Sequence, residues 1–213
     1  MMGLNMSYST YISKQSRKPT GIFGRFVMSF FFEKGNVELN TLVYEALSVE
    51  KDDHALEIGF GPGTLIKKIA EHLDNGIIEG IELSKSMVAT AQKKNREHIN
   101  NGKVKIHLGD FDVVVLKDNC FDKIFSVNTI YFWKNPVTTI SKIYRILKPG
   151  GKVVIGFHDK RDMENMSIDP DMFQYYYPHD VTELLSIHGS LNNIDMISKK
   201  GKQNMCYCAV GTK

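Results

Sequence analysis

Cysteine and proline are scarce in this sequence, which has three cysteines and six prolines among 213 residues. Three cysteines cannot all pair, which argues against a disulfide framework. Cys206 and Cys208 lie two apart in an alternating apolar stretch, so they share one face if that stretch is a strand. We expect reduced packing residues in a cytosolic (cytoplasmic) protein. We expect no metal centre, because Cys-x-Cys alone supplies too few zinc ligands.

Long apolar runs are also missing. No segment approaches the roughly 20 apolar residues of a transmembrane helix, and the N-terminal stretch lacks the apolar core of a secretory signal. The formal net charge is only +3, and residues 1–35 have five basic residues against one acid. The rest of the chain therefore has no excess of basic residues to bind a nucleic-acid backbone, and we expect no nucleic-acid partner.

The chain is long enough for one domain with a full core. Residues 1–20 are polar and predict a mobile arm, whereas the Ile and Phe residues of 22–31 recur on one face of a helix. Three interpretations stay open for this helix: core packing, a lid over a site, or peripheral contact with a membrane. We divide the chain into an N-terminal arm and cap helix, 1–36, and a single domain, 37–213.

From residue 55 onward, short apolar runs alternate with amphipathic segments. The runs predict strands at 55–59, 76–83, 104–109, 121–127, 152–157, 193–199 and 205–212. Helices are predicted at 65–73, from Ser84 to about His98, from Pro136 to Leu147, and near 180–189, where Asp180 and Glu183 suggest a capping box. Lys148-Pro149-Gly150-Gly151 is expected to be a stop and turn. This pattern predicts a doubly wound α/β fold, with a seven-stranded, mostly parallel sheet, an antiparallel C-terminal edge hairpin and N-terminal helices.

The stretch "ALEIGFGPGT" places Gly59, Gly61 and Gly63 between the first strand and the next helix. Glycines at this turn let the loop bend tightly and let a ligand lie against its backbone. A dinucleotide fingerprint would need a third glycine where Thr64 stands, and Glu57 adds a negative charge that disfavours a pyrophosphate. The same charge suits a cationic ligand, and Glu82 at the end of the second strand can accept hydrogen bonds from ribose hydroxyls.

The four segments "LEIGFGPGT", "GIELS", "GDF" and "LKPGG" occur in that order and spacing. With them, the chain over about 37–213 resembles the class I S-adenosylmethionine-dependent methyltransferases of Rossmann-like fold. It is similar in particular to the small-molecule group that includes the ubiquinone/menaquinone methyltransferases. The resemblance implies S-adenosyl-L-methionine as cofactor and a small-molecule methyl acceptor as partner.

The resemblance also implies a set of cofactor-binding residues. Glu57 and the turn at Gly59, Phe60 and Gly61 would face the methionine moiety, and Gly63 would let the following helix pack closely. Around the nucleoside, Glu82 would hold the ribose, and Leu83 and Met87 would flank the adenine. Asp110, with Phe111 beside it, would accept a hydrogen bond from the adenine amino group. Asn128 would lie near the methionine end. Asp110 as a helix cap and Met87 as a core residue remain alternative interpretations.

Methyl transfer from a sulfonium needs no protein nucleophile, and a general base only if the acceptor must lose a proton. Tyr131 and His158 are weak candidates for such a catalytic role. Asn128 and Tyr131 also match the outer residues of the Asn-Pro-Pro-Tyr motif of methyltransferases that act on amines of nucleic acids or proteins, but both prolines are missing. Such an N-methyltransferase, or a SAM-binding module without catalysis, is the alternative. Tyr131, Phe132 and Trp133 are expected either to line an acceptor pocket or to pack in the core.

Overall fold

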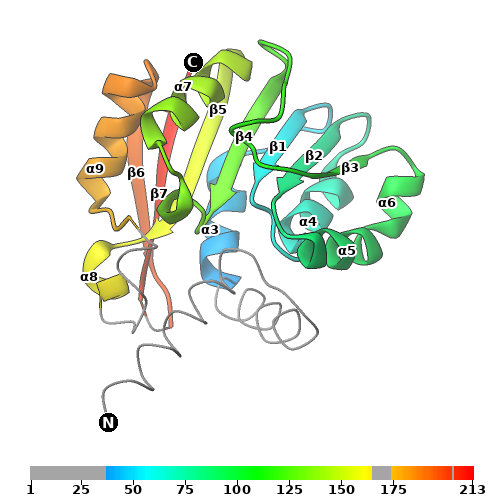
Figure 1. Ribbon diagram of the computed structural model, residues 1–213, viewed down its shortest axis with the longest axis horizontal. Coiled ribbons are helices and arrows are strands. Elements are labelled where there is room, and N and C mark those ends of the chain that lie inside the picture. Colours follow the sequence, from blue (N-terminus) through cyan, green and yellow to red (C-terminus); the bar gives the residue numbers. More distant parts are fainter. Residues whose placement is uncertain (1–36, 165–173, 203) are drawn as a thin grey trace.

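Seven strands of the described chain pair into one sheet with the order β3-β2-β1-β4-β5-β7-β6. The computed structural model describes residues 37–164, 174–202 and 204–213 (Figure 1). The strands are β1 (His54–Ile58), β2 (Ile77–Glu82), β3 (Val104–Leu108), β4 (Phe121–Val127), β5 (Leu147–His158), β6 (Asn192–Lys200) and β7 (Met205–Thr212). β1 to β5 are parallel, and β7 pairs antiparallel with β5 and β6. The predicted sheet and its antiparallel edge hairpin are confirmed.

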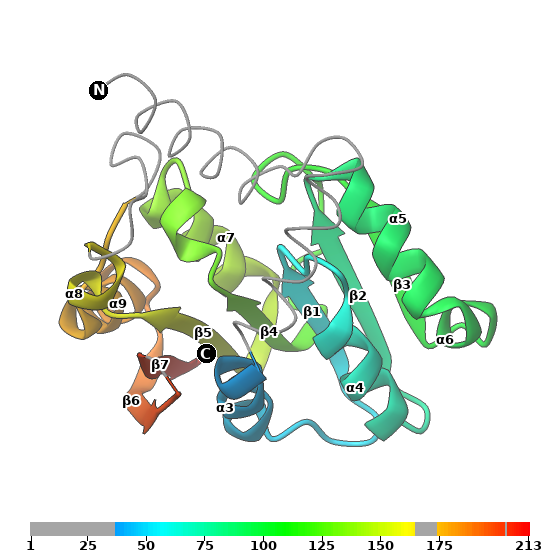
Figure 2. The same ribbon diagram turned by 90° about the horizontal axis from the view of Figure 1, so that it is seen from below.

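Helices cover both faces of this sheet. They are α3 (Val37–Leu47), α4 (Thr64–His72), α5 (Lys85–Lys94), α6 (Arg96–Asn100), α7 (Pro136–Ile146), α8 (Lys160–Glu164) and α9 (Pro178–Glu183), with the 3-10 turn η1 (Ile130–Phe132) and the π-helical turn η3 (Leu184–His188). Figure 2 shows α7 on one side of β4 and β5 and α3 on the other. The helices therefore enclose the parallel strands in two separate apolar layers, as a doubly wound sheet requires.

The layer under α3, α4 and α5 contains Cys206 and Cys208, both buried and both free thiols. This confirms their interpretation as reduced packing residues on one strand face. The phenylalanine-rich helix predicted at 22–31 lies outside the described residues, so the division of the chain at residue 36 stays a prediction. Among the helices that are described, none is both long and apolar enough to cross a membrane.

The helix predicted from Ser84 to His98 is two helices, because Asn95 interrupts it. The Asn95 side chain is fully buried and its Nδ2 donates to the carbonyl oxygens of Gly63, at 3.0 Å, and Ala91, at 2.9 Å. The first of these bonds reaches across to the N-terminus of α4. A tertiary hydrogen bond thus overrides the continuous helical pattern of the sequence.

The predicted capping box of Asp180 and Glu183 is also wrong. The helix begins two residues earlier, at Pro178, and the Asp180 carboxylate instead accepts a hydrogen bond from the backbone N–H of Tyr177 at 2.8 Å. Asp180 therefore occupies the third helical position, and Pro178 occupies the first, which suits its fixed φ and missing N–H.

The predicted stop at Lys148-Pro149-Gly150-Gly151 is only half right. α7 does end at Ile146, but β5 starts at once, with Leu147 paired to Phe121. The pairing then shifts register before Lys123 meets Lys152, and Gly150 has a φ of +76° within this irregular stretch. The glycines thus serve a bulge inside a long strand rather than a separate turn.

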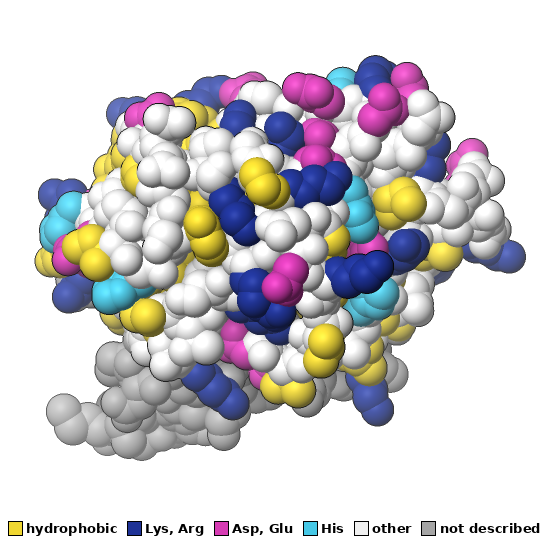
Figure 3. All heavy atoms as spheres, turned by 90° about the horizontal axis from the view of Figure 1, so that it is seen from above, with side chains coloured by type: hydrophobic (Ala, Val, Ile, Leu, Met, Phe, Trp, Pro, Cys, Tyr) yellow, Lys and Arg dark blue, Asp and Glu magenta, His cyan; other side chains and the backbone are white. Residues whose placement is uncertain are grey.

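The amino ends of the parallel strands form a face where opposite charges alternate. Figure 3 views this face from above and shows Lys, Arg, Asp, Glu and His side chains interspersed. On β2, the Glu79 side chain is 12% exposed and bonds His54 Nε2 at 2.9 Å and His107 Nε2 at 2.8 Å, with Lys105 Nζ at 3.4 Å. The hydrogen bond with His54 lowers the pKa of Glu79, and burial opposes this shift. The bond with His107 lowers the pKa further, to about 2. These contacts cross-link β1, β2 and β3.

We predict that Glu79→Gln lowers the free energy of unfolding at pH 7 by about 1–3 kcal/mol, because it removes charged hydrogen bonds. A lowered pKa in the folded state stabilises the fold above the unfolded value near 4.5 and loses that effect as pH falls toward 2. Denaturant titrations at pH 7 and pH 3.5 should therefore show a smaller difference between wild type and variant at the lower pH. Glu71→Gln, at an exposed pair with Lys67, is the control and should change stability by less than about 0.5 kcal/mol. An equal loss at both pH values would contradict the prediction.

Candidate functional site

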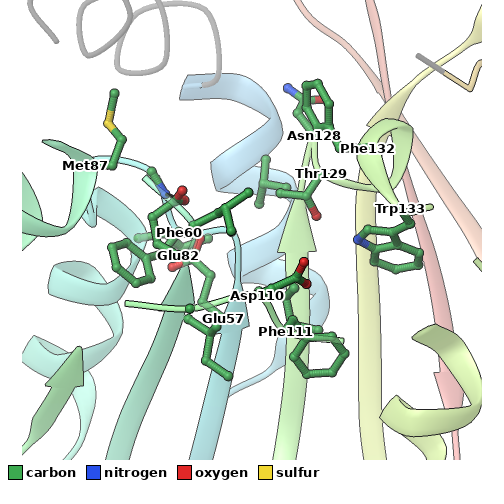
Figure 4. Close-up of a pocket in the computed structure, with 18 of the residues that line it drawn as sticks. Glu57, Phe60, Glu82, Met87, Asp110, Phe111, Asn128, Thr129, Phe132 and Trp133 are labelled. Atoms are coloured by element: carbon green, nitrogen blue, oxygen red, sulfur yellow. Dashed lines mark hydrogen bonds between the residues drawn. The ribbon is translucent and has the colours of Figure 1, made fainter. Parts of the chain in front are cut away.

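A cavity of about 1150 Å³, including its part open to solvent, lies at the carboxyl ends of β1, β2 and β4. Open α/β sheets bind ligands at this edge, where the strand order reverses. Figure 4 shows the lining side chains, with Met87 on one side and Phe132 and Trp133 on the other. Of the predicted cofactor residues, the lining includes Glu57, Gly59, Phe60, Gly61, Glu82, Leu83, Met87, Asp110, Phe111 and Asn128.

The turn after β1 depends on its glycines. Gly59, Gly61 and Gly63 all have φ between +53° and +72°, a region that other residues rarely adopt. A Cβ on Gly59 would lie 2.4 Å from the Thr129 methyl, and one on Gly63 would lie 2.7 Å from Ala91 Cβ. Gly59 therefore lets the segment after β4 approach the turn. Gly63 does not line the cavity; it lets α4 pack against α5, as the sequence suggested.

Glu82 ties this turn to the end of β2. Its Oε2 accepts from the Gly61 N–H at 3.1 Å, and its Oε1 accepts from the Ser84 N–H at 2.8 Å. Burial raises the pKa of Glu82, while these backbone N–H groups act in the opposite direction. Each carboxylate oxygen retains a second lone pair, so the group can still accept bonds from two ligand hydroxyls.

Glu57 is buried beside Glu82, and no hydrogen-bond donor of the described residues compensates for this burial. Its side chain is 4% exposed, and its Oε2 has no hydrogen-bond partner among the described residues. Burial, and then the charge of Glu82, raises the pKa of Glu57 well above its usual value. A buried carboxyl group that lacks a donor favours a ligand that brings a cation or a hydrogen-bond donor to it.

The turn after β3 forms another wall. Asp110 Oδ1 accepts from the Asp112 N–H at 3.0 Å, and the Asp110 carbonyl accepts from the N–H groups of Val113 and Val114. This compact turn places the Asp110 carboxylate and the Phe111 ring in the cavity lining. Asp110 thus caps a turn and not a helix, so its interpretation as a helix cap is wrong, and its role toward adenine stays a prediction.

The segment after β4 closes the cavity on the side of the aromatic residues. Asn128 has a φ of +54°, which is uncommon for a residue with a side chain. Phe132 and Trp133 line the cavity, whereas Tyr131 does not. Asn40 from α3, Asp112, Thr129 and Lys134 also line it. No local pattern predicted these four, because their positions depend on how α3 and the loops pack against the sheet.

Tyr131 and His158 lie outside the cavity lining. The Tyr131 hydroxyl accepts from the His158 backbone N–H at 2.6 Å, and burial raises its pKa. The His158 ring donates from Nδ1 to the Met205 carbonyl at 2.9 Å. Both side chains thus hold the end of β5 in place. The Tyr131 hydroxyl also lies 3.3 Å from Oδ1 of Asn128, which lines the cavity, so a catalytic role for Tyr131 or His158 stays a prediction.

Comparisons with known proteins support the same interpretation as the geometry of the cavity does. Residues 56–155 match the family model described as a methyltransferase domain. The chain is 24% identical over 187 residues to the methyltransferase YdaC of Bacillus subtilis, which covers 88% of this chain and 98% of YdaC. It is 36% identical over 106 residues to phosphoethanolamine N-methyltransferase 2 of Caenorhabditis elegans, which covers 49% of this chain and 24% of that protein.

Among solved structures, a SAM-dependent methyltransferase from Aquifex aeolicus matches with a TM-score of 0.70 and 17% identity. The match covers 88% of this chain and 97% of the other, and at this identity it shows the fold. The narrower resemblance to the ubiquinone/menaquinone group stays a prediction. The methyltransferase domain match, the methyltransferase relatives and the fold thus support the resemblance of the chain to the class I S-adenosylmethionine-dependent methyltransferases.

Proposed function

We propose that this enzyme transfers the methyl group to a small-molecule acceptor bound beside Thr129, Phe132 and Trp133. The observation that supports the proposal is a single cavity that joins the glycine turn and two buried carboxylates to this partly aromatic wall. Donor and acceptor must lie within about 3–3.5 Å of each other for an in-line displacement, so both need access to one space. The cavity provides it.

The residues of the cavity fit the donor. The buried Glu57 carboxyl group, which lacks a partner among the described residues, would receive the positively charged methionine end. Glu82, already oriented by two backbone N–H groups, would hold the ribose hydroxyls. Asp110 would accept from the adenine amino group, with Phe111 and Met87 beside the ring. These assignments agree with the roles that the sequence motifs imply.

The bound donor supplies an activated methyl group on a sulfonium, so the protein has mainly to position the acceptor and exclude water. Alignment of this kind can lower a barrier by about 7–11 kcal/mol. None of the described histidines lines the cavity. We infer that the acceptor attacks with a lone pair that requires no histidine base, and that Phe132 and Trp133 hold its apolar part.

The test is a titration followed by an acceptor panel. Calorimetry should show binding of S-adenosylmethionine and of its demethylated product, but not of NAD. A panel of amines, phenols, thiols and carboxylates should then contain an acceptor that is methylated, and it should include phosphoethanolamine because one relative carries that name. Trp133→Ala should raise the KM for that acceptor at least about fivefold and leave donor affinity within about twofold. Donor binding without methylation of any class would contradict the proposal.

We predict that Gly61→Val weakens donor binding more than about tenfold, because a side chain at this turn would occupy the space next to the ligand. No described atom lies within 4 Å of the position of the added Cβ, so the fold itself has room for it. Gly102→Val is a matched control, since Gly102 also has a positive φ, +75°, and open space, but lies outside the cavity lining. The two variants should lose similar stability in thermal melts while only Gly61→Val loses affinity. If the two variants bind the donor with equal affinity, the turn is not part of the donor site.

We predict that Glu57→Gln stabilises the ligand-free protein at pH 8 and weakens donor binding at least about tenfold. A carboxyl whose pKa is raised in the folded state destabilises the fold as pH rises through that value, and glutamine carries no such charge. Wild-type affinity should also increase with pH as Glu57 ionises, whereas the affinity of the variant should be nearly independent of pH. Melting curves and calorimetry at a series of pH values measure both effects, and Glu97→Gln, at an exposed residue of α6, is the control. If the variant binds the donor with unchanged affinity, the positively charged methionine end is bound by another residue.

A further inference from the structure

The ammonium group of Lys142, on α7, bonds to backbone carbonyl groups rather than to a carboxylate. Its ammonium donates to the carbonyl oxygens of Phe111 and Val114, the latter at 2.6 Å. It also lies 4.6 Å from the centre of the Phe111 ring, within the range of a cation–π contact. Lys142 is therefore anchored at three points to the turn after β3.

A second contact joins the same helix and the same turn. The Thr139 hydroxyl, one turn before Lys142, donates to Asp112 Oδ1 at 2.8 Å. The Thr139 side chain is almost fully buried, and Asp112 itself lines the cavity. Residues 110–114 form this turn. Hydrogen bonds within the turn hold it at Asp110, and the Thr139 and Lys142 side chains of α7 bond to its other residues.

Simple packing does not account for this arrangement. A lysine ammonium is strongly hydrated and gains little from leaving water unless it forms several hydrogen bonds. Arg145 lies three residues along on α7 and shows the usual alternative, since its guanidinium pairs with Asp118 and half of the side chain is exposed. Lys142 instead is partly buried and donates to carbonyl groups of the turn that carries Asp110 and Phe111 into the cavity.

We propose that Lys142 and Thr139 are positioning residues that hold turn 110–114 where Asp110 and Phe111 recognise the adenine of the donor. The proposal rests on the proposed function of the cavity. Neither residue lines the cavity, so neither touches the ligand. They act on binding by fixing the distance between the Asp110 carboxylate and the Phe111 ring, which together distinguish a base with an amino group from one with a carbonyl at that place.

The experiment compares two probes, S-adenosylmethionine and its inosine counterpart, in which a carbonyl replaces the adenine amino group. The wild type should prefer the adenine form. Lys142→Met, which keeps the length of the side chain without its donors, should bind S-adenosylmethionine about tenfold more weakly and lose most of this preference. The KM for the donor should rise while kcat at saturating donor stays within about twofold, because the acceptor side is unchanged. Lys142→Arg, which keeps donors, should recover part of the preference.

Arg145→Met is the matched control on the same helix and should change neither affinity nor preference. Thr139→Val is nearly isosteric and carries the test if Lys142→Met does not fold; it should reduce the preference in the same direction. Retained preference in both folded variants would overturn the proposal, and so would weaker binding of both probes by the same factor, since general loosening of the turn gives that result. If the wild type binds neither probe, the proposed function fails instead, which keeps the two failures distinct.

Discussion

Two carboxyl groups, Glu57 and Glu82, are buried side by side at the ends of neighbouring strands, and the rest of the cavity is arranged around them. Burial raises the pKa of both, but only Glu82 is compensated by backbone N–H groups. Glu57 keeps an oxygen without a donor, which in a folded protein costs about 1–3 kcal/mol or more. Such a cost at the ligand edge of the sheet is understandable if the cationic donor supplies the missing charge when it binds. Under the proposed function, the cofactor supplies the charge that Glu57 lacks.

The central part of this site could be predicted from the sequence because its signals are local. Gly59, Gly61 and Gly63 follow an apolar strand at fixed spacing, and Glu82 ends the next strand, so periodicity and turn chemistry place all four. The fold followed for the same reason, since each strand and helix has its own pattern. Ten of the eleven proposed cofactor residues line the cavity, and Gly63 has the packing role expected of it.

What could not be predicted depends on contacts between distant segments. Asn40 enters the cavity lining because α3 packs on the sheet, and Thr129 because Gly59 lets the segment after β4 come close. Asn95 sits at a position where the helical pattern continues, yet its bond to the Gly63 carbonyl ends α5. His158 is the last residue of β5, one residue beyond the predicted strand, and its ring donates to the Met205 carbonyl. In each case a tertiary hydrogen bond or a close approach of two segments determines the structure, and the local sequence pattern does not indicate it.

The arrangement of α7 suggests how the two ends of the cavity are related. The helix follows directly on the wall that contains Phe132, Trp133 and Lys134, with Asn135 accepting from the Thr138 N–H at its start. Its middle, at Thr139 and Lys142, holds the turn with Asp110 and Phe111 on the donor side. A helix of 11 residues with one face buried against the sheet moves as a unit. Any shift that adjusts the acceptor wall must therefore also move the adenine side or break the Lys142 contacts. A rigid link of this kind suits a displacement reaction, in which the distance between donor and acceptor matters more than any single catalytic group.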